Sequence, residues 1–257
     1  MIIARAELRE RQHVLDLDSR PAEEAVRQVR CIEQALDLRP GKTVLDITCA
    51  TGRYSLLLAR NGCQVTGLDI NSDYLALAKT RAAAAGVKIR TVAGDMRLLP
   101  RLFPEKFDAA FIMYSSFGYF PAHGDNVEVI KGVREVLGPG GRFLLDVTNR
   151  GWFIRNYRPS DYVLHENQFI TRDFQVTDQQ VLLHENVFRP AQSIMSWSVL
   201  TMASPDPLFT VTYRMYSVHE IIGIIEKSGL RVDRIMGGYD AKPFSLLSER
   251  IICVAIR

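Results

Sequence analysis

The sequence of 257 residues is poor in cysteine and contains no long apolar run. Its four cysteines, Cys31, Cys49, Cys63 and Cys253, show no C-x-x-C spacing. Because a chain of this length does not need disulfides to fold, we expect free thiols in a reducing compartment. No apolar run approaches the roughly 18 residues that cross a bilayer, and the opening Met1–Ala4 is too short for a secretory signal. These absences predict a cytoplasmic protein without a membrane partner.

An excess of charge of one sign is also lacking. The 32 Lys and Arg residues against 29 Asp and Glu residues leave a net charge of +3, which is too small to indicate a nucleic-acid or membrane surface as partner. Apolar residues make up 47% of the chain, enough for a sizeable core, so a disordered, collagen-like or disulfide-stapled protein is excluded.

Short apolar runs alternate with helix-period stretches over the first 150 residues. The predicted strands are Thr43–Ile47, Gln64–Asp69, Lys88–Ala93, Phe107–Met113 and Arg142–Val147. The predicted helices are Pro21–Asp37, Arg53–Asn61, a segment from Asn71 or Ser72 to Ala85, and Asp125–Leu137. Nearly continuous apolar strands between helices are typical of a parallel sheet covered on both faces, a doubly wound α/β fold.

The last 40 residues continue this pattern. Ser217–Glu220 has a capping-box signature, which predicts a helix to about Ser228. Arg231–Met236 and Arg250–Ile256 are predicted strands joined by a loop without a long helix. Such a connection favours an antiparallel final strand.

Residues 151–215 are predicted to form an antiparallel β insertion within a single domain of residues 1–257. The segments 169–176, 179–188, 193–202 and 208–216 are half-polar and strand-like. The aromatic and basic residues of the insertion, Phe169, Arg172, Phe174, Trp197 and Tyr213, predict either a lid that selects a small substrate or the surface of a homodimer. The sequence LHEN occurs twice, at 164–167 and 183–186. Because His and Glu neighbours in a strand point to opposite faces, two similar strands are favoured over a metal site, and no metal is predicted.

Three acids follow three successive predicted strands. Asp46 lies at the end of the first, and the turn behind it carries small residues every second position. Asp69 ends the second strand, where a carboxylate can accept both hydroxyls of a ribose, and Asp95 follows the third, where it can accept from an adenine amino group. A dinucleotide site is disfavoured, because the turn reads Thr48-x-Ala50-x-Gly52 instead of G-x-G-x-x-G.

The run VLDITCATGRYSLLLARNGCQVTGLDI resembles the cofactor-binding segment of class I S-adenosylmethionine-dependent methyltransferases of the bacterial small-molecule type. The likeness continues through Ala93–Met96, Ser116–Phe120, Leu137–Asp146 and Arg214–Glu220, and it spans about residues 20–257. It implies a seven-stranded sheet of order 3-2-1-4-5-7-6 with strand 7 antiparallel. It also implies S-adenosyl-L-methionine as cofactor, with S-adenosyl-L-homocysteine as the product.

The resemblance assigns twelve residues to the cofactor: Asp46, Thr48, Ala50, Thr51, Gly52, Tyr54, Asp69, Ile70, Asp95, Met96, Tyr114 and Ser115. The first turn would face the methionine half, Asp69 the ribose, Asp95 and Met96 the adenine, and Tyr114 and Ser115 the region of the sulfonium. Thr48 and Ala50 stand where the family usually has glycine, and Tyr54 where the closest relatives have His. A β-branched residue is strained at positive φ, so we expect the backbone of Thr48 to have a negative φ.

Methyl transfer from a sulfonium is an in-line displacement, in which positioning and exclusion of water supply most of the rate. If the acceptor must lose a proton, the candidate bases are His123, expected in the loop after the fourth strand, Tyr119 and His219. Asp146, Asn149 and Arg150 are candidates for substrate binding or for a salt bridge that anchors the insertion. The acceptor atom, O, N or C, is not predicted.

Nucleic-acid substrates are disfavoured, because the amino-directed base methyltransferases carry [DNS]-P-P-[YF] where this chain reads Tyr114-Ser-Ser-Phe117. Two further hypotheses remain at this point. One is an NAD(P)-dependent oxidoreductase, and the other is a non-catalytic protein that binds a nucleoside.

Overall fold

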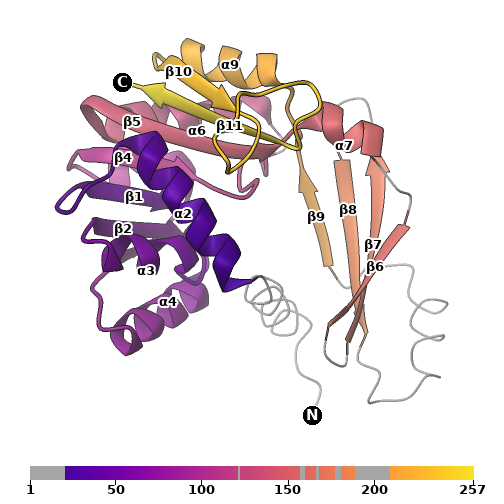
Figure 1. The fold of residues 1–257 in the computed structure, drawn as a ribbon, viewed down its shortest axis with the longest axis horizontal. Coiled ribbons are helices and arrows are strands. Elements are labelled where there is room, and N and C mark those ends of the chain that lie inside the picture. Colours follow the sequence, from indigo (N-terminus) through magenta and orange to yellow (C-terminus); the bar gives the residue numbers. More distant parts are fainter. Residues whose placement is uncertain (1–20, 121, 157–159, 166–167, 177–180, 189–208) are drawn as a thin grey trace. The chain divides into compact units, whose positions relative to one another are not determined.

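A seven-stranded sheet organises most of the computed structural model, which describes residues 21–120, 122–156, 160–165, 168–176, 181–188 and 209–257 (Figure 1). Its strands are β1 (Thr43–Ile47), β2 (Gln64–Asp69), β3 (Arg90–Ala93), β4 (Phe107–Ile112), β5 (Leu137–Thr148), β10 (Arg231–Met236) and β11 (Arg250–Ile256). The spatial order is β10-β11-β5-β4-β1-β2-β3, in which β11 runs antiparallel to both β5 and β10, and the other neighbours are parallel. The order and the antiparallel last strand that the resemblance implied are confirmed.

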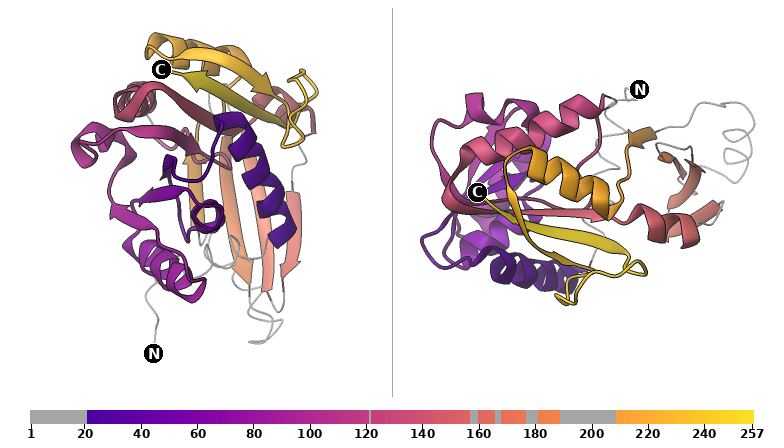
Figure 2. Two further views of the ribbon diagram at one scale, coloured as in Figure 1. Left: turned by 60° about the vertical axis from the view of Figure 1, so that its left-hand side comes forward. Right: turned by 90° about the horizontal axis from the view of Figure 1, so that it is seen from above.

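Helices cover both faces of this sheet (Figure 2). They are α2 (Ala22–Leu36), α3 (Arg53–Arg60), α4 (Ser72–Ala84), α5 (Leu99–Leu102), α6 (His123–Val136) and α9 (Val218–Lys227), and the 3₁₀ turn η1 spans Met96–Leu98. Along β1, Leu45 and Ile47 pack in the core with α5, α6 and α9, whereas Val44 packs in the core with α2 and α3. Because successive strand residues face opposite layers and both layers are apolar, the strands read as nearly continuous hydrophobic runs.

Helix starts follow the predicted caps. The side chain of Asn71 accepts from the backbone N–H groups of Asp73 and Tyr74 at 2.9 and 3.2 Å. The capping box of Ser217 and Glu220 is present at the start of α9. Both caps satisfy backbone donors that the first helical turn leaves open, so these two helix boundaries were readable from the sequence.

Three local predictions were wrong. His123 is not in a loop but is the first residue of α6. β5 begins at Leu137 rather than Arg142, because Leu137 pairs with Phe107 of β4. A register shift follows this pair, and Gly138–Gly141 are therefore part of the strand. Residues 151–156, predicted as the start of the β insertion, instead belong to a short helix, α7 (Arg150–Asn156), and the side chain of Asn149 accepts from the Gly151 N–H at 3.0 Å in its first turn.

The chain divides into two compact units. The larger comprises residues 21–155 and 215–257, and the smaller contains the described residues between 156 and 214. The smaller unit is a four-stranded antiparallel sheet in the order β6 (Ser160–His165), β7 (Gln168–Val176), β8 (Val181–Phe188) and β9 (Phe209–Tyr213). The antiparallel character of the insertion is thereby confirmed, whereas its place within a single domain stays a prediction.

Several predictions for the insertion lie outside the described residues. These are the strand at 193–202, Trp197 within it, and the second half of the first LHEN sequence, Glu166–Asn167. In the described part of the chain, no helix is long and apolar enough to cross a membrane.

Candidate cofactor site

The turn between β1 and α3 has a left-handed backbone at every second residue. The φ angles are 69° at Thr48, 47° at Ala50 and 82° at Gly52. The expectation that Thr48 has a negative φ is therefore wrong. A non-glycine residue in this region costs on the order of 1–3 kcal/mol, so the surrounding structure must impose the conformation.

Hydrogen bonds from both sides fix this turn. The Ala50 N–H donates to Asp69 Oδ2 at 2.8 Å, and the Cys49 N–H donates to the Leu68 carbonyl at 2.9 Å. Gly67 of β2 lies directly below, where a Cβ atom would come within 2.6 Å of the Cys49 sulfur. The close approach of the turn to β2 therefore requires glycine at position 67 and holds Thr48 and Ala50 in the conformation that glycine usually adopts.

An Ala50→Gly substitution is expected to raise the free energy of unfolding by about 0.5–1 kcal/mol. Glycine removes the cost of about 1–2 kcal/mol for alanine in the left-handed region and adds back roughly 0.5–1 kcal/mol of chain entropy. The matched control is Ala76→Gly at an exposed position of α4, which should lower the free energy of unfolding by about 1 kcal/mol. Urea unfolding measures both, and a destabilised Ala50→Gly variant would show that the turn is unstrained.

Asp69 and Asp46 lie behind this turn on neighbouring strands. Asp69 Oδ2 accepts from Ala50 and Oδ1 accepts from the Asn71 N–H at 2.9 Å, so the carboxylate joins the turns after β1 and β2. Asp46 is 1% exposed and accepts from Ser55 Oγ of α3 at 2.6 Å. Burial raises the pKa of Asp46 to about 7, against the opposing effect of the Ser55 hydrogen bond, and the Asp69 charge adds to the increase. The sequence predicted both acids at this place, and the structure brings them together.

The third acid, Asp95, is held by its own loop. Its carboxylate accepts from the Arg97 N–H at 2.8 Å and from the Arg97 guanidinium at 2.6–3.1 Å, and these bonds lower the pKa of Asp95. Arg97 also donates to Asp125 at 3.1 Å, and its guanidinium lies 4.5 Å from the centre of the Phe120 ring. Arg97 was not predicted as a site residue, and it links the loop after β3 to α6 through its ion pair with Asp125.

The turn after β4 is also left-handed, with φ angles of 56° at Tyr114 and 63° at Ser115. The Tyr114 N–H donates to Asp146 Oδ2 at 2.9 Å, and the Ser115 N–H donates to the Asp146 carbonyl at 3.0 Å. Asp146 is fully buried and forms an ion pair with Arg250 at 2.8 Å. The Tyr239 hydroxyl donates to Asp146 Oδ2 at 2.7 Å. Asp146 is thus part of a buried network beneath the predicted site.

The charges in this network stabilise one another. Burial opposes the charge on Arg250 most strongly, but the Asp146 charge and hydrogen bond, together with the neighbouring Tyr239 and Tyr114, outweigh it and raise the pKa of the guanidinium. Burial, with the Asp146 charge, raises the pKa of Tyr239, so its hydroxyl stays protonated and donates. Neither Arg250 nor Tyr239 was predicted as a site residue.

The remaining predicted site residues have different surroundings. Tyr54 is buried, and its hydroxyl donates to Gln28 of α2 at 2.9 Å. Ile70 is 76% exposed, whereas Met96 is buried at the start of η1. Thr51 and Gly52 are buried in the first turn.

The candidate bases and anchoring residues lie around the end of β4 and the start of α9. Tyr119 is 42% exposed, and His123 and His219 are exposed in the first turns of α6 and α9. Arg150 forms an ion pair with Glu220 at 3.2 Å within the larger unit, and the predicted salt bridge to the insertion stays a prediction.

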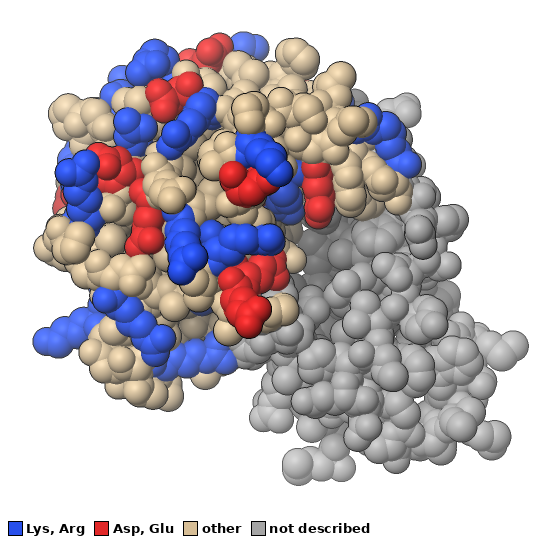
Figure 3. Space-filling view, viewed as in Figure 1, with Lys and Arg blue, Asp and Glu red and all other residues tan. Residues whose placement is uncertain are grey.

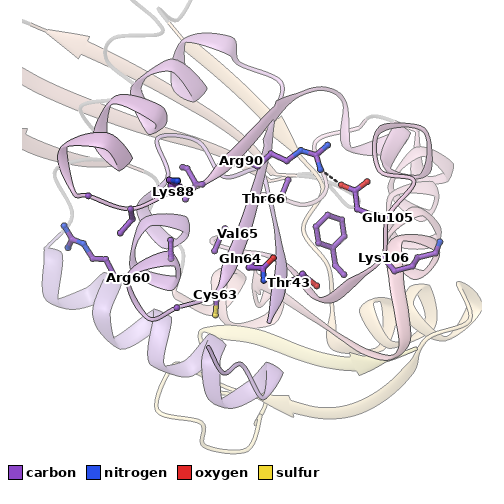
Figure 4. A pocket seen from close by; sticks show the side chains of 16 residues that line it. Thr43, Arg60, Cys63, Gln64, Val65, Thr66, Lys88, Arg90, Glu105 and Lys106 are labelled. Atoms are coloured by element: carbon purple, nitrogen blue, oxygen red, sulfur yellow. Dashed lines mark hydrogen bonds and ion pairs between the residues drawn. The ribbon is translucent and has the colours of Figure 1, made fainter. Parts of the chain in front are cut away.

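A groove of about 990 Å³ lies at the opposite end of the sheet, along the amino ends of β1, β2 and β3 (Figure 4). Figure 4 shows Arg60 and Lys106 pointing to opposite sides, and Arg90 is paired with Glu105. The Lys and Arg side chains of this groove therefore do not point toward one common place. On the face in Figure 3, Lys and Arg are likewise interspersed with Asp and Glu over the coloured residues. Ligands of open α/β sheets bind at the carboxyl ends of the strands, so the acid-bearing turns form the candidate site.

Comparisons with known proteins point to methyltransferases. The family described as "Methyltransferase domain" matches residues 44–141, which run from β1 to β5. The chain is 26% identical over 210 residues to the putative methyltransferase YqeM of Bacillus subtilis, covering 81% of each chain. It is 26% identical to the cypemycin N-terminal methyltransferase of a Streptomyces species, covering 84% of each.

Two solved structures show the same fold. An S-adenosylmethionine-dependent methyltransferase from Clostridium acetobutylicum superposes with a TM-score of 0.77 at 18% identity, covering 97% of this chain and 98% of that one. CalS10, an amino pentose methyltransferase from Micromonospora echinaspora solved with bound cofactor, has a TM-score of 0.64 at 19% identity, covering 100% and 97%.

The matched family model and the sheet order with its antiparallel last strand agree. Residues 44–141 match the methyltransferase-domain family, and the larger unit has the fold of S-adenosylmethionine-dependent methyltransferases.

Proposed function

We propose that the protein transfers a methyl group from S-adenosylmethionine to a small-molecule acceptor at the carboxyl end of its sheet. The observation that carries this proposal is the Asp69 carboxylate, which joins the two turns flanking β2 through its bonds to Ala50 and Asn71. A carboxylate at the carboxyl end of a parallel strand can accept both hydroxyls of a ribose, which is the role proposed for Asp69.

The chemistry of the acids fits the cofactor, which supplies an electrophilic methyl group on a sulfonium. Asp46 and Asp69 offer negative charge and acceptors to a ligand that carries an ammonium, a sulfonium and two hydroxyls. Asp46 and the Thr48–Gly52 turn would hold the methionine half, and Asp69 the ribose. Asp95 and Met96 would hold the adenine, with Arg97 fixing the Asp95 carboxylate.

Tyr114 and Ser115 would line the site next to the sulfonium. No acid is needed for the leaving group, so these residues align the acceptor and exclude water. His123, Tyr119 and His219 stay predictions as bases for an acceptor that must lose a proton.

The acceptor class rests on the relatives. The chain is 34% identical over 119 residues to a demethylmenaquinone methyltransferase of Thermus thermophilus, and it shares the fold of an amino pentose methyltransferase. These names describe different acceptors, so the choice among O, N and C is left open. A homodimer through the insertion stays a prediction. The four cysteines are buried and form no disulfide, which supports the prediction of a reducing, cytoplasmic compartment.

An Asp69→Asn substitution is expected to weaken binding of S-adenosylmethionine by about 1.5 kcal/mol, roughly tenfold. The amide replaces a charged acceptor by a neutral one, and hydrogen bonds to charged groups are the stronger. Titration calorimetry with S-adenosylmethionine and S-adenosylhomocysteine measures the effect, and thermal unfolding checks that the turns stay folded.

The matched control is Asp73→Asn in the first turn of α4, an exposed acid near the same site, which should leave affinity unchanged. Binding of NADH by the wild type without binding of S-adenosylmethionine would contradict the proposed function. An unchanged affinity of Asp69→Asn would remove Asp69 from the site.

A further inference from the structure

Asp146 of β5 holds the backbone of Tyr114 and Ser115, and Arg250 of the last strand contacts their side chains. Arg250, the first residue of β11, donates to Asp146 Oδ1 at 2.8 Å, to Thr148 Oγ1 at 3.1 Å and to Ser115 Oγ at 3.3 Å. Ser115 Oγ also lies 3.0 Å from Thr148 Oγ1 and accepts from the Thr148 N–H at 3.0 Å. One guanidinium therefore joins the end of β5 to the turn after β4.

The same guanidinium lies over the aromatic ring of Tyr114, 5.4 Å from its centre. The Tyr114 side chain is 41% exposed, although its backbone N–H is bonded to the buried Asp146 carboxylate. The ring is thus supported from behind by a buried cation and presented at the carboxyl end of β4. Because Asp146 neutralises Arg250, the ring can still accept a second positive charge nearby.

Stability alone is a weak reason for such a network. A buried ion pair is often no more stabilising than well-packed apolar residues of the same size. Consecutive non-glycine residues with left-handed backbone persist only where surrounding contacts impose them, and such residues cluster at functional sites. Asp146 bonds the backbone of this turn and Arg250 contacts both of its side chains, which indicates that the ion pair positions the turn.

We propose that Arg250 is a positioning residue for methyl transfer, anchored on Asp146, which fixes the Tyr114–Ser115 turn and holds the Tyr114 ring against the sulfonium of the cofactor. This inference rests on the proposed function. It adds a residue from the last strand to a site otherwise built from the turns after β1 to β4.

The test uses S-adenosylmethionine with a ¹³C-labelled methyl group, so no acceptor is required. In Tyr114→Leu, the ¹³C resonance of the bound methyl group should move from its wild-type position. The preference for the cationic S-adenosylmethionine over the neutral S-adenosylhomocysteine should fall about threefold to fivefold, the usual strength of an exposed cation–π contact. Arg250→Lys should change both readouts in the same direction, because one ammonium cannot bond Asp146, Thr148 and Ser115 together.

Two further variants keep the test decisive. Ser115→Ala removes only the hydroxyl that Arg250 and Thr148 contact, so it should shift the methyl resonance even if Arg250→Lys folds poorly. Tyr239→Phe is the matched control, since it also removes a buried hydrogen bond to Asp146 but, among the described residues, Tyr239 donates to Asp146 and not to the turn, and the variant should leave both readouts at wild-type values.

The outcomes separate the two proposals. If wild-type protein binds no S-adenosylmethionine, the proposed function fails. If it binds and Tyr114→Leu, Arg250→Lys and Ser115→Ala keep the wild-type resonance and selectivity, the positioning role is overturned while the proposed function stands. Equal changes in Tyr239→Phe and Arg250→Lys would also overturn it, because the effect would then be general to the buried network.

Discussion

An Arg250→Met substitution is expected to lower the free energy of unfolding by about 3–5 kcal/mol. Methionine fills much of the same volume but leaves the Asp146 carboxylate, which is fully buried, without its cation. The Tyr239 hydroxyl and the Tyr114 N–H still donate to Asp146, yet neither carries charge. The cost is that of an uncompensated buried charge, not the net value of the ion pair.

Urea unfolding followed by circular dichroism measures this loss. The matched control is Arg142→Met on β5, whose ion pair with Asp233 has an N–O distance of 3.4 Å and leaves both side chains 31% exposed. Exposed pairs are worth about 0–1 kcal/mol, so the control should change little. The double variant Arg250→Met with Asp146→Asn should recover part of the loss, because no charge is then buried. A loss below 1 kcal/mol in Arg250→Met alone would show that water reaches Asp146.

Much of the larger unit could be predicted because its signals are local. Asp69 ends the strand β2, and the caps at Asn71 and Ser217 bond groups only two or three residues away. Such features can be read from a short stretch of sequence, because the interacting residues are neighbours in the chain. The start of β5 could not be read in this way. Its Gly-Pro-Gly-Gly stretch favours a turn, and only the pairing of Leu137 with Phe107 makes it a strand.

In the candidate site, too, features with a local signal were predicted and contacts between distant residues were not. The acids Asp46 and Asp69 were predicted because each ends a strand of a parallel sheet. The φ of Thr48 was predicted wrongly, because the intrinsic preference of a β-branched residue gives way to the bond between Ala50 and Asp69, 19 residues apart. Asp146 was a candidate for a salt bridge, but its partners in the buried network were not predicted. Arg250 and Tyr239 lie 104 and 93 residues from Asp146 in the chain, and no pattern within one element shows that they meet.

Binding of S-adenosylmethionine is expected to tighten as the pH rises towards 7, by roughly tenfold per pH unit at most. The cause is Asp46, whose pKa burial raises to about 7, so the free protein holds this carboxyl neutral below that pH. A cationic ligand binds the ionised form more strongly, and binding below pH 7 must release the proton. Between pH 5.5 and 7 the ammonium of the ligand stays charged, so the change in affinity reports Asp46.

The same titration acts on stability with the opposite sign. In the unfolded chain the carboxyl ionises near its ordinary pKa of 3.8, well below the folded value of about 7. The contribution of Asp46 to stability is therefore fully present below pH 4 and is lost as the pH rises through 7. Asp46→Asn stays neutral throughout, so it should remove this slope from the unfolding free energy and the pH dependence from the dissociation constant. Calorimetry and urea unfolding across the range measure both, and a wild-type affinity that is flat from pH 5.5 to 7, or a slope that persists in Asp46→Asn, would place the titrating group elsewhere.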